Sequence, residues 1–328
     1  MKSQFATMRA LTWILICSVG FVSGGATCAR REPVMALPPP PPVLGATPAL
    51  VDVVAAVNRT SAIRELSSNS ATVDVLSMPA LPKLSATLAL RKEREFRLRA
   101  SLPIVMGSGL DMGSNDALFW FEVPEGMGRT LYFAHHEQYR QQLQRAILPV
   151  DPTWVMGSLG LTQLDAANVV QGPVMRPDGK LELRSTVPMP SGTYQQVCYV
   201  DAQKGHVTDQ FLYSPSGATI AESHAWNHQY YVDQQCSLPH NVKLILNPAS
   251  GPPLELQIDV GTYAVNQILS GDPNLFVIPQ GANNVVDLTT IGPVSGTIVT
   301  PASYRSAGSQ SENLGPMPYR GLVEPPSP

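Results

Sequence analysis

Charged side chains are scarce in this sequence: Asp, Glu, Lys and Arg together make up 14% of its 328 residues, and the net charge is only −3. No cluster of Lys and Arg is long enough to follow a phosphate backbone, so we predict no nucleic-acid partner. The sequence also lacks a G-x-S-x-G elbow, a P-loop and an H-E-x-x-H zinc motif. Because no acid, base and nucleophile stand in a recognisable constellation, we predict neither an enzyme nor a bound cofactor.

Long hydrophobic runs are missing too, apart from one near the N-terminus. Leu11–Val22 is largely apolar and carries no charge, but it is shorter than the roughly 20 residues of a membrane-spanning helix. It follows Lys2 and Arg9 and precedes a run of small residues, which is typical of a secretory signal peptide over residues 1–27. The small residues end at Cys28, an order that resembles the bacterial lipobox, in which such a cysteine becomes lipidated.

The N-terminus therefore predicts a protein of the cell envelope, anchored to a membrane through a lipid on Cys28. No Asp follows shortly after this cysteine, which favours the outer membrane facing the periplasm. Cleavage after Ala26 with plain secretion and an uncleaved anchor remain alternatives.

Proline is abundant only toward the two ends. Pro38–Pro42 favours a semi-rigid polyproline helix, so residues 28–47 are interpreted as a tether, although a disordered tail without a spacer role is the alternative. Residues 291–328 are rich in Pro, Gly and Ser and are predicted to be disordered.

Cysteine is rare, with four residues in the whole chain. Cys17 leaves with the signal peptide and Cys28 carries the lipid. Cys198 and Cys236 then form an even pair in an oxidising compartment, which predicts a disulfide bond. Two buried free thiols are the alternative.

The region from residue 48 to residue 290 has the patterning of one folded domain. Thr47-Pro48 begins a predicted helix that runs to about Glu65. Hydrophobicity then alternates with period two, most clearly in Arg94–Leu102 and Leu254–Val260, which is typical of strands with one solvated face. Gly107–Gly113 is interpreted as a flexible turn, and Asp151-Pro152 as the start of a second, short helix.

Further strands are predicted at 84–90, 117–123, 131–134, 181–187, 194–200, 207–213, 218–231 and 242–246. Turn sequences such as Pro177-Asp178-Gly179 separate the later ones. The predicted fold class is mainly β: a curved antiparallel sheet of about nine to eleven strands, forming an incomplete barrel with two or three helices on its concave side.

Two groups of polar side chains contain residue types that can bind a metal ion. Glu222, His224 and His228 share one strand face if the strand is regular, but a polar outer face of the sheet is the preferred interpretation. His135-His136-Glu137 is interpreted as a solvated entry into a helix. We therefore predict no metal site.

Several segments resemble bacterial lipoproteins of the lipoprotein-localisation (LolA/LolB-like) carrier and receptor fold. They are VDVVAAVN (51–58), LRKEREFRLRAS (90–101), NDALFWFEV (115–123), Leu238–Leu244, Leu254–Ile258, Asn266 and Leu275–Pro279. The resemblance covers about residues 49–280. It implies an incomplete barrel whose concave side, lidded by helices, holds lipid acyl chains.

The residues that we expect to face this concave side and contact lipid are Leu88, Phe96, Leu98, Trp120, Leu256 and Ile258. The predicted partner is a lipid or an acylated lipoprotein. The alternative is a structural envelope lipoprotein whose core is filled by side chains and whose surface binds a protein partner, because burial alone would account for all six residues.

Overall fold

The computed structural model describes residues 40–91, 94–101, 108–125, 128–141, 150, 152–190, 192–248, 252–267 and 272–290. The predicted signal peptide, Cys28, most of the tether and the predicted tail lie outside these ranges.

The helical elements are α2 (Leu50–Val57), η1 (Asn58–Ala62), α3 (His136–Arg140), α4 (Pro152–Met156), η3 (Gly157–Leu161), η4 (Ala166–Asn168) and η5 (Val232–Gln234). The first strands are β1 (Glu65–Val75), β2 (Leu84–Arg91), β3 (Glu95–Ser101), β4 (Ser108–Ser114), β5 (Leu118–Glu125), β6 (Gly128–His135) and β7 (Val169–Met175). The later strands are β8 (Lys180–Met189), β9 (Gly192–Asp201), β10 (Val207–Tyr213), β11 (Thr219–Tyr231), β12 (Cys236–Leu246), β13 (Leu254–Val260), β14 (Ala264–Val265) and β15 (Asn284–Asp287).

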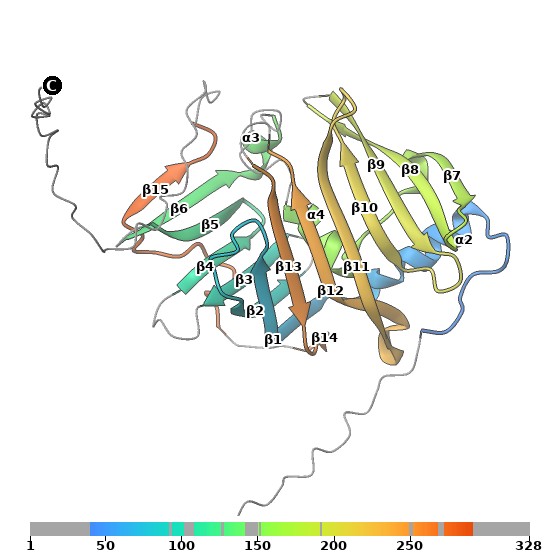
Figure 1. The fold of residues 1–328 in the computed structure, drawn as a ribbon, viewed down its shortest axis with the longest axis horizontal. Coiled ribbons are helices and arrows are strands. Elements are labelled where there is room, and N and C mark those ends of the chain that lie inside the picture. The colour runs from blue at the N-terminus through green and yellow to red at the C-terminus, as the bar shows by residue number, and fades with distance from the viewer. Residues whose placement is uncertain are drawn as a thin grey trace, which may run out of the picture. The chain divides into compact units, whose positions relative to one another are not determined.

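These strands form one curved sheet of 15 strands (Figure 1). Their order is β15-β6-β5-β4-β3-β2-β1-β13-β12-β11-β10-β9-β8-β7, with β14 paired to β1. Neighbours are antiparallel, as short hairpin connections require, except that β15 runs parallel to β6. The order ends at β7 and β15, so the sheet is open. The predicted mainly β class and incomplete barrel are confirmed, although the sheet has more strands than predicted.

The alternation in β3 shows how the sequence assigns side chains to the two faces of the sheet. Phe96 and Leu98 are 2% exposed and lie on the face that we call the inner face, whereas Arg99 points to the other side and is exposed. Leu98 is paired with Leu88 on β2, and Ile258 on β13 is paired with Val73 on β1. One continuous hydrophobic core therefore covers the inner face from β3 to β12.

A segment outside the sheet covers part of this inner face. It comprises α4 and η3, residues 152–161, and we call it the covering segment. Val155, Met156 and Leu159 are buried in the same core as the strands, and η3 lies against β11 and β12. Gly160 has φ +97°, and a Cβ at this position would come within 2.6 Å of Pro239 on β12. Only glycine fits this close approach without strain.

Helix α2 is shorter than predicted. It begins after Ala49 rather than at Thr47, and its amide end is capped by Asp52, whose carboxylate accepts a hydrogen bond from the Ala49 N–H at 3.1 Å. After Val57 the chain tightens into η1 and then enters β1 at Glu65. The buried side of α2 packs against β8 and β9 and forms a second hydrophobic cluster there.

On the outer face, Arg97 is buried although it is charged. Its guanidinium forms a two-point contact with Asp111 on β4, at 2.9 and 2.6 Å. The backbone of residues 274–277 crosses the outer face here, and three of its carbonyl oxygens accept hydrogen bonds from Arg97 Nη1. Every polar group of this buried side chain thereby has a partner.

Across the ranges described, no helix is long and apolar enough to cross a membrane.

Candidate functional site

Five of the six residues predicted to contact lipid lie together on the inner face. They are Leu88, Phe96, Leu98, Leu256 and Ile258. Each is at most 5% exposed and belongs to the same hydrophobic core. Sequence alternation alone placed these side chains on one face, because successive side chains of a strand point to opposite sides.

The prediction that Trp120 faces inward is wrong. Its partner on β4 is Gly113, which is paired in turn with Arg97 on β3, so all three lie on the outer face. The Arg97 guanidinium lies 5.6 Å from the centre of the indole, and a Cβ at Gly113 would overlap the ring. In the run of apolar residues around Trp120 both faces of the strand are apolar, so the sequence pattern does not distinguish them.

The apolar inner face continues beyond the fully buried core, across β4, β5 and β6. Leu110 and Met112 are half-buried and pack against the core. Met112 is paired with Phe121, and Phe121 with Tyr132, and these two rings stack at 4.8 Å between centroids. We call Leu110, Met112, Phe121 and Tyr132 the inner-face row.

The covering segment packs against β11 and β12 and contains one of the buried polar atoms without a hydrogen-bond partner in the described ranges. Ser158 and Thr162 donate hydrogen bonds to the carbonyls of Trp154 and Gly157, within the segment and its C-terminal boundary. Trp154 Nε1 is buried, and no hydrogen-bond acceptor lies near it in the described part of the chain. A buried N–H without an acceptor costs about 1–3 kcal/mol, so a ligand oxygen at this position would remove an existing penalty.

The predicted disulfide bond is not formed, and both Cys198 and Cys236 are free and buried. Cys198 lies on β9 and Cys236 on β12, and strands β10 and β11 lie between them. Neighbouring strands are ~4.8 Å apart, so this separation far exceeds the ~7 Å limit between the Cα atoms of a disulfide. Burial raises the pKa of Cys198 to about 12 and that of Cys236 to about 11, which keeps both as unreactive thiols.

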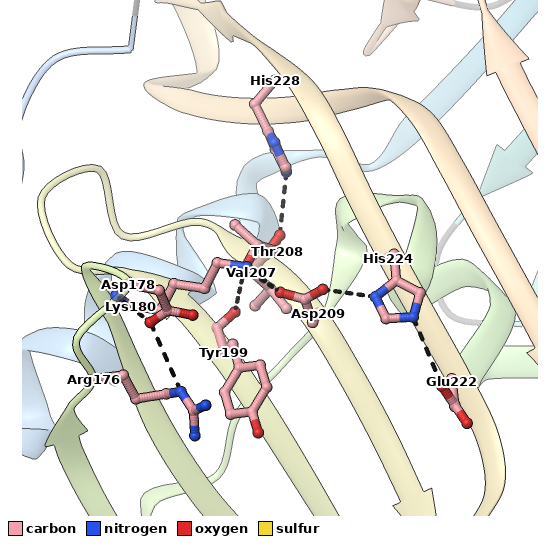
Figure 2. A network of polar contacts seen from close by, with 10 residues as sticks. All are labelled: Arg176, Asp178, Lys180, Tyr199, Val207, Thr208, Asp209, Glu222, His224 and His228. Carbon is pink, nitrogen blue, oxygen red and sulfur yellow. Dashed lines mark hydrogen bonds and ion pairs between the residues drawn. The ribbon is translucent and has the colours of Figure 1, made fainter.

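Polar side chains form a network on the outer face of β8 to β11 (Figure 2). Asp209 accepts hydrogen bonds from His224 Nδ1 and from Lys180 Nζ, both at 2.7 Å, and from Thr208 at 2.8 Å. Burial raises the pKa of Asp209, but these hydrogen bonds outweigh it and lower the pKa to about 2. The hydrogen bond to Asp209 raises the pKa of His224 in turn. The polar side chains of this network therefore act as hydrogen-bond donors and acceptors for one another.

The side chains of Glu222, His224 and His228 do not converge on a common point that could hold a metal ion. His224 lies between Asp209 and Glu222, with Nε2 3.8 Å from the Glu222 carboxylate. His228 Nε2 lies instead 3.2 Å from the Val207 carbonyl oxygen. In the ranges that the structure covers, no three His, Cys, Asp or Glu side chains are grouped closely enough to hold a metal ion.

The predicted entry into a helix at His135-His136-Glu137 is confirmed as α3, but His136 is not solvated. It is 2% exposed, and its Nε2 lies 2.8 Å from the Asn115 carbonyl oxygen. This histidine connects α3 to the turn between β4 and β5.

Known proteins give only distant likenesses. No protein-family model and no curated protein matches the chain. Solved structures similar to it include a putative outer membrane lipoprotein-sorting protein domain from Vibrio parahaemolyticus (9% identity, TM-score 0.46, 68% of this chain and 95% of that one). Two others are a LolA superfamily protein from Nitrosomonas europaea (9%, 0.37, 65% and 93%) and a DUF1329 family protein from Desulfovibrio piger (9%, 0.44, 67% and 92%).

The resemblance predicted from the sequence thus has counterparts among solved structures. With TM-scores below 0.5, these three likenesses assign neither a family nor a function to this chain.

The sequence analysis did not identify the inner-face row, chiefly because it did not predict strand β4. The signal was present, because Leu110, Met112 and Ser114 alternate with Gly109, Asp111 and Gly113. The glycines led to the interpretation of a turn, whereas the structure has strand β4 there. Gly113 is required because the Trp120 ring occupies the space of its side chain.

Proposed function

We propose that this protein is an exported envelope lipoprotein, anchored through Cys28, that binds the acyl chain of a lipid or lipoprotein on the inner face of its sheet. The observation that carries the proposal is the inner-face row, an apolar strip whose four side chains are only half-buried. Leu110 and Met112 pack against the main core, whereas Phe121 and Tyr132 pack against a third cluster, which consists of Phe119, Ala134, Tyr139 and Leu288. An acyl chain lying along this strip would bury methylenes at about 0.8 kcal/mol each.

The covering segment supports the same proposal. Its described contacts with the sheet are made by apolar side chains, including Trp154, Val155 and Leu159. Contacts of this kind are non-directional, so an acyl chain can replace them with little loss of specific hydrogen bonding.

Native mass spectrometry of the mature chain with Cys28→Ser, isolated from cell envelopes in mild detergent, tests the proposal. We expect a co-purified mass that corresponds to a phospholipid or another acylated lipid. Met112→Gln should reduce lipid occupancy at least several-fold, because it places an amide on the apolar strip. The matched control is Met175→Gln on β7, where the side chain is 52% exposed and lies outside the inner-face row.

One observation favours a second candidate function, that of an envelope lipoprotein with a filled core. Leu88, Leu98 and Ile258 are already buried by protein side chains, so the central part of the core is filled. The same experiment separates the two proposals. Absence of lipid from the wild-type chain, including after incubation with phosphatidylglycerol vesicles, would refute acyl binding and favour an envelope lipoprotein that acts through a protein partner.

A further inference from the structure

A groove on a different part of the molecule has the composition of a ligand site. Its volume is about 390 Å³, within the range of small-molecule sites. Its walls come from the β9–β10 connection and from the irregular part of β11. The lining residues are Pro40, Lys180, Lys204, His206, Thr208, Ala225, Trp226, Asn227 and His228. None of these residues belongs to the inner-face row or the covering segment.

The aromatic part of the groove is Trp226, which is 43% exposed. It precedes Asn227, which has a positive φ of 57° although β11 continues through it. An exposed indole offers a flat, electron-rich face on which the C–H groups of a ring can pack.

The charged side chains of the lining itself are lysines, and Asp201 lies close enough to act electrostatically on His206 and His228. No residue of its lining is acidic. Lys180 is already paired with Asp209 at 2.7 Å, whereas Lys204 is exposed and no ion pair is recorded for it among the described residues. Lys204 can therefore accept the negative charge of a ligand without giving up an internal partner.

A stacked pair of histidines forms the base of the groove. The rings of His206 and His228 lie 3.8 Å apart and 18° from parallel. His228 Nε2 contacts the Val207 carbonyl at 3.2 Å, but His206 Nδ1 is buried and has no hydrogen-bond partner within the described ranges. Burial lowers the pKa of His206 to about 4 and that of His228 to about 3, so the pair is neutral near pH 7. A neutral imidazole leaves one nitrogen free to bond a hydroxyl group.

From this arrangement we infer that the groove binds a phosphorylated sugar, with the sugar ring on Trp226, the phosphate at Lys204 and a hydroxyl group at His206. Asn227 supplies a further donor and acceptor for hydroxyl groups at the walls, and Thr208 Oγ1, which already donates to Asp209, supplies an acceptor. The sugar can come from a soluble metabolite or from a lipid headgroup, because the chemistry of recognition is shared. The inference does not depend on acyl binding at the inner face, since the two sites share no residue.

Calorimetric titration of the full-length protein in detergent, with glucose 6-phosphate, glucose and inorganic phosphate as separate probes, tests the inference. We expect glucose 6-phosphate to bind at least ten-fold more tightly than either fragment. Trp226→Ala and Lys204→Gln should each weaken this binding at least ten-fold. The control is Lys243→Gln, which removes a lysine that is paired with Glu255 at 2.9 Å and does not line the groove, and it should leave the affinity unchanged.

Vesicles distinguish the two sources of the sugar. Co-sedimentation of the Cys28→Ser chain that is stronger with vesicles containing a phosphorylated glucosamine lipid than with vesicles of phosphatidylglycerol alone, and that falls to the phosphatidylglycerol level in Trp226→Ala, would assign the lipid headgroup. Binding of glucose 6-phosphate without such co-sedimentation would assign a soluble sugar. No binding of glucose 6-phosphate, equal binding of inorganic phosphate, or full binding by the Trp226→Ala variant would each overturn the inference.

Discussion

The buried Arg97–Asp111 pair on the outer face gives the sharpest test of the structure. The two side chains are only 5% and 8% exposed, and a two-point contact joins them. Arg97→Met would keep much of the packing of the stem but leave the carboxylate of Asp111 buried with a weakened partner. It would also leave three backbone carbonyls without their donor. Removal of one member of a buried pair costs about 3–5 kcal/mol, so we expect a loss of unfolding free energy in that range.

Arg99 provides the matched control within the same strand. Its guanidinium also faces Asp111, at 3.5 Å, but its side chain is 46% exposed. Arg99→Met should therefore cost at most about 1 kcal/mol, as other exposed ion pairs do. Urea unfolding followed by tryptophan fluorescence measures both variants. Equal losses for Arg97→Met and Arg99→Met would refute the assignment of Arg97 to a buried, fully paired position.

The double variant Arg97→Met/Asp111→Leu sharpens the same test. It replaces both charges with apolar groups, so no unpaired carboxylate remains buried. We expect it to be more stable than Arg97→Met alone. A double variant that is less stable would show that lost packing, rather than an unpaired charge, dominates the cost.

Three further predictions follow from the cysteines, the histidine pair and the anchor. Because Cys198 and Cys236 are free, dithiothreitol should leave the Tm unchanged. Both cysteines should also react with iodoacetamide after denaturation without prior reduction. Cysteines that react only after reduction would contradict the structure. His206 and His228 resist protonation when folded, whereas their unfolded forms titrate near 6.5, so stability should be full above that pH and fall as the pH drops from 6.5 toward 4. His228→Phe should flatten this decline in thermal unfolding curves, and an unchanged slope would count against the buried, neutral pair. Cys28→Ser should abolish labelling of the protein by a fatty-acid probe in cells; persistent labelling would disprove the proposed anchor.

Period-two hydrophobicity predicted much of the sheet. Strands β3 and β13 lie within one residue of their predicted positions, because each has one apolar and one polar face. Strand β1 was missed because Ser67, Ser68 and Asn69 interrupt its pattern, and tertiary pairing with β2 and β13 overrides their weak strand preference. The glycines of β4 hid that strand in the same way.

The sequence by itself determined that alternating segments form a large antiparallel sheet with one apolar face, and it placed five of the six predicted inward residues correctly. These are local properties, set by the opposite directions of successive side chains. Only the tertiary structure decided which face Trp120 takes, how far Cys198 lies from Cys236, and which side chains form the groove around Trp226. Each of these depends on the order and register of strands distant in sequence, which hydrophobic periodicity does not encode.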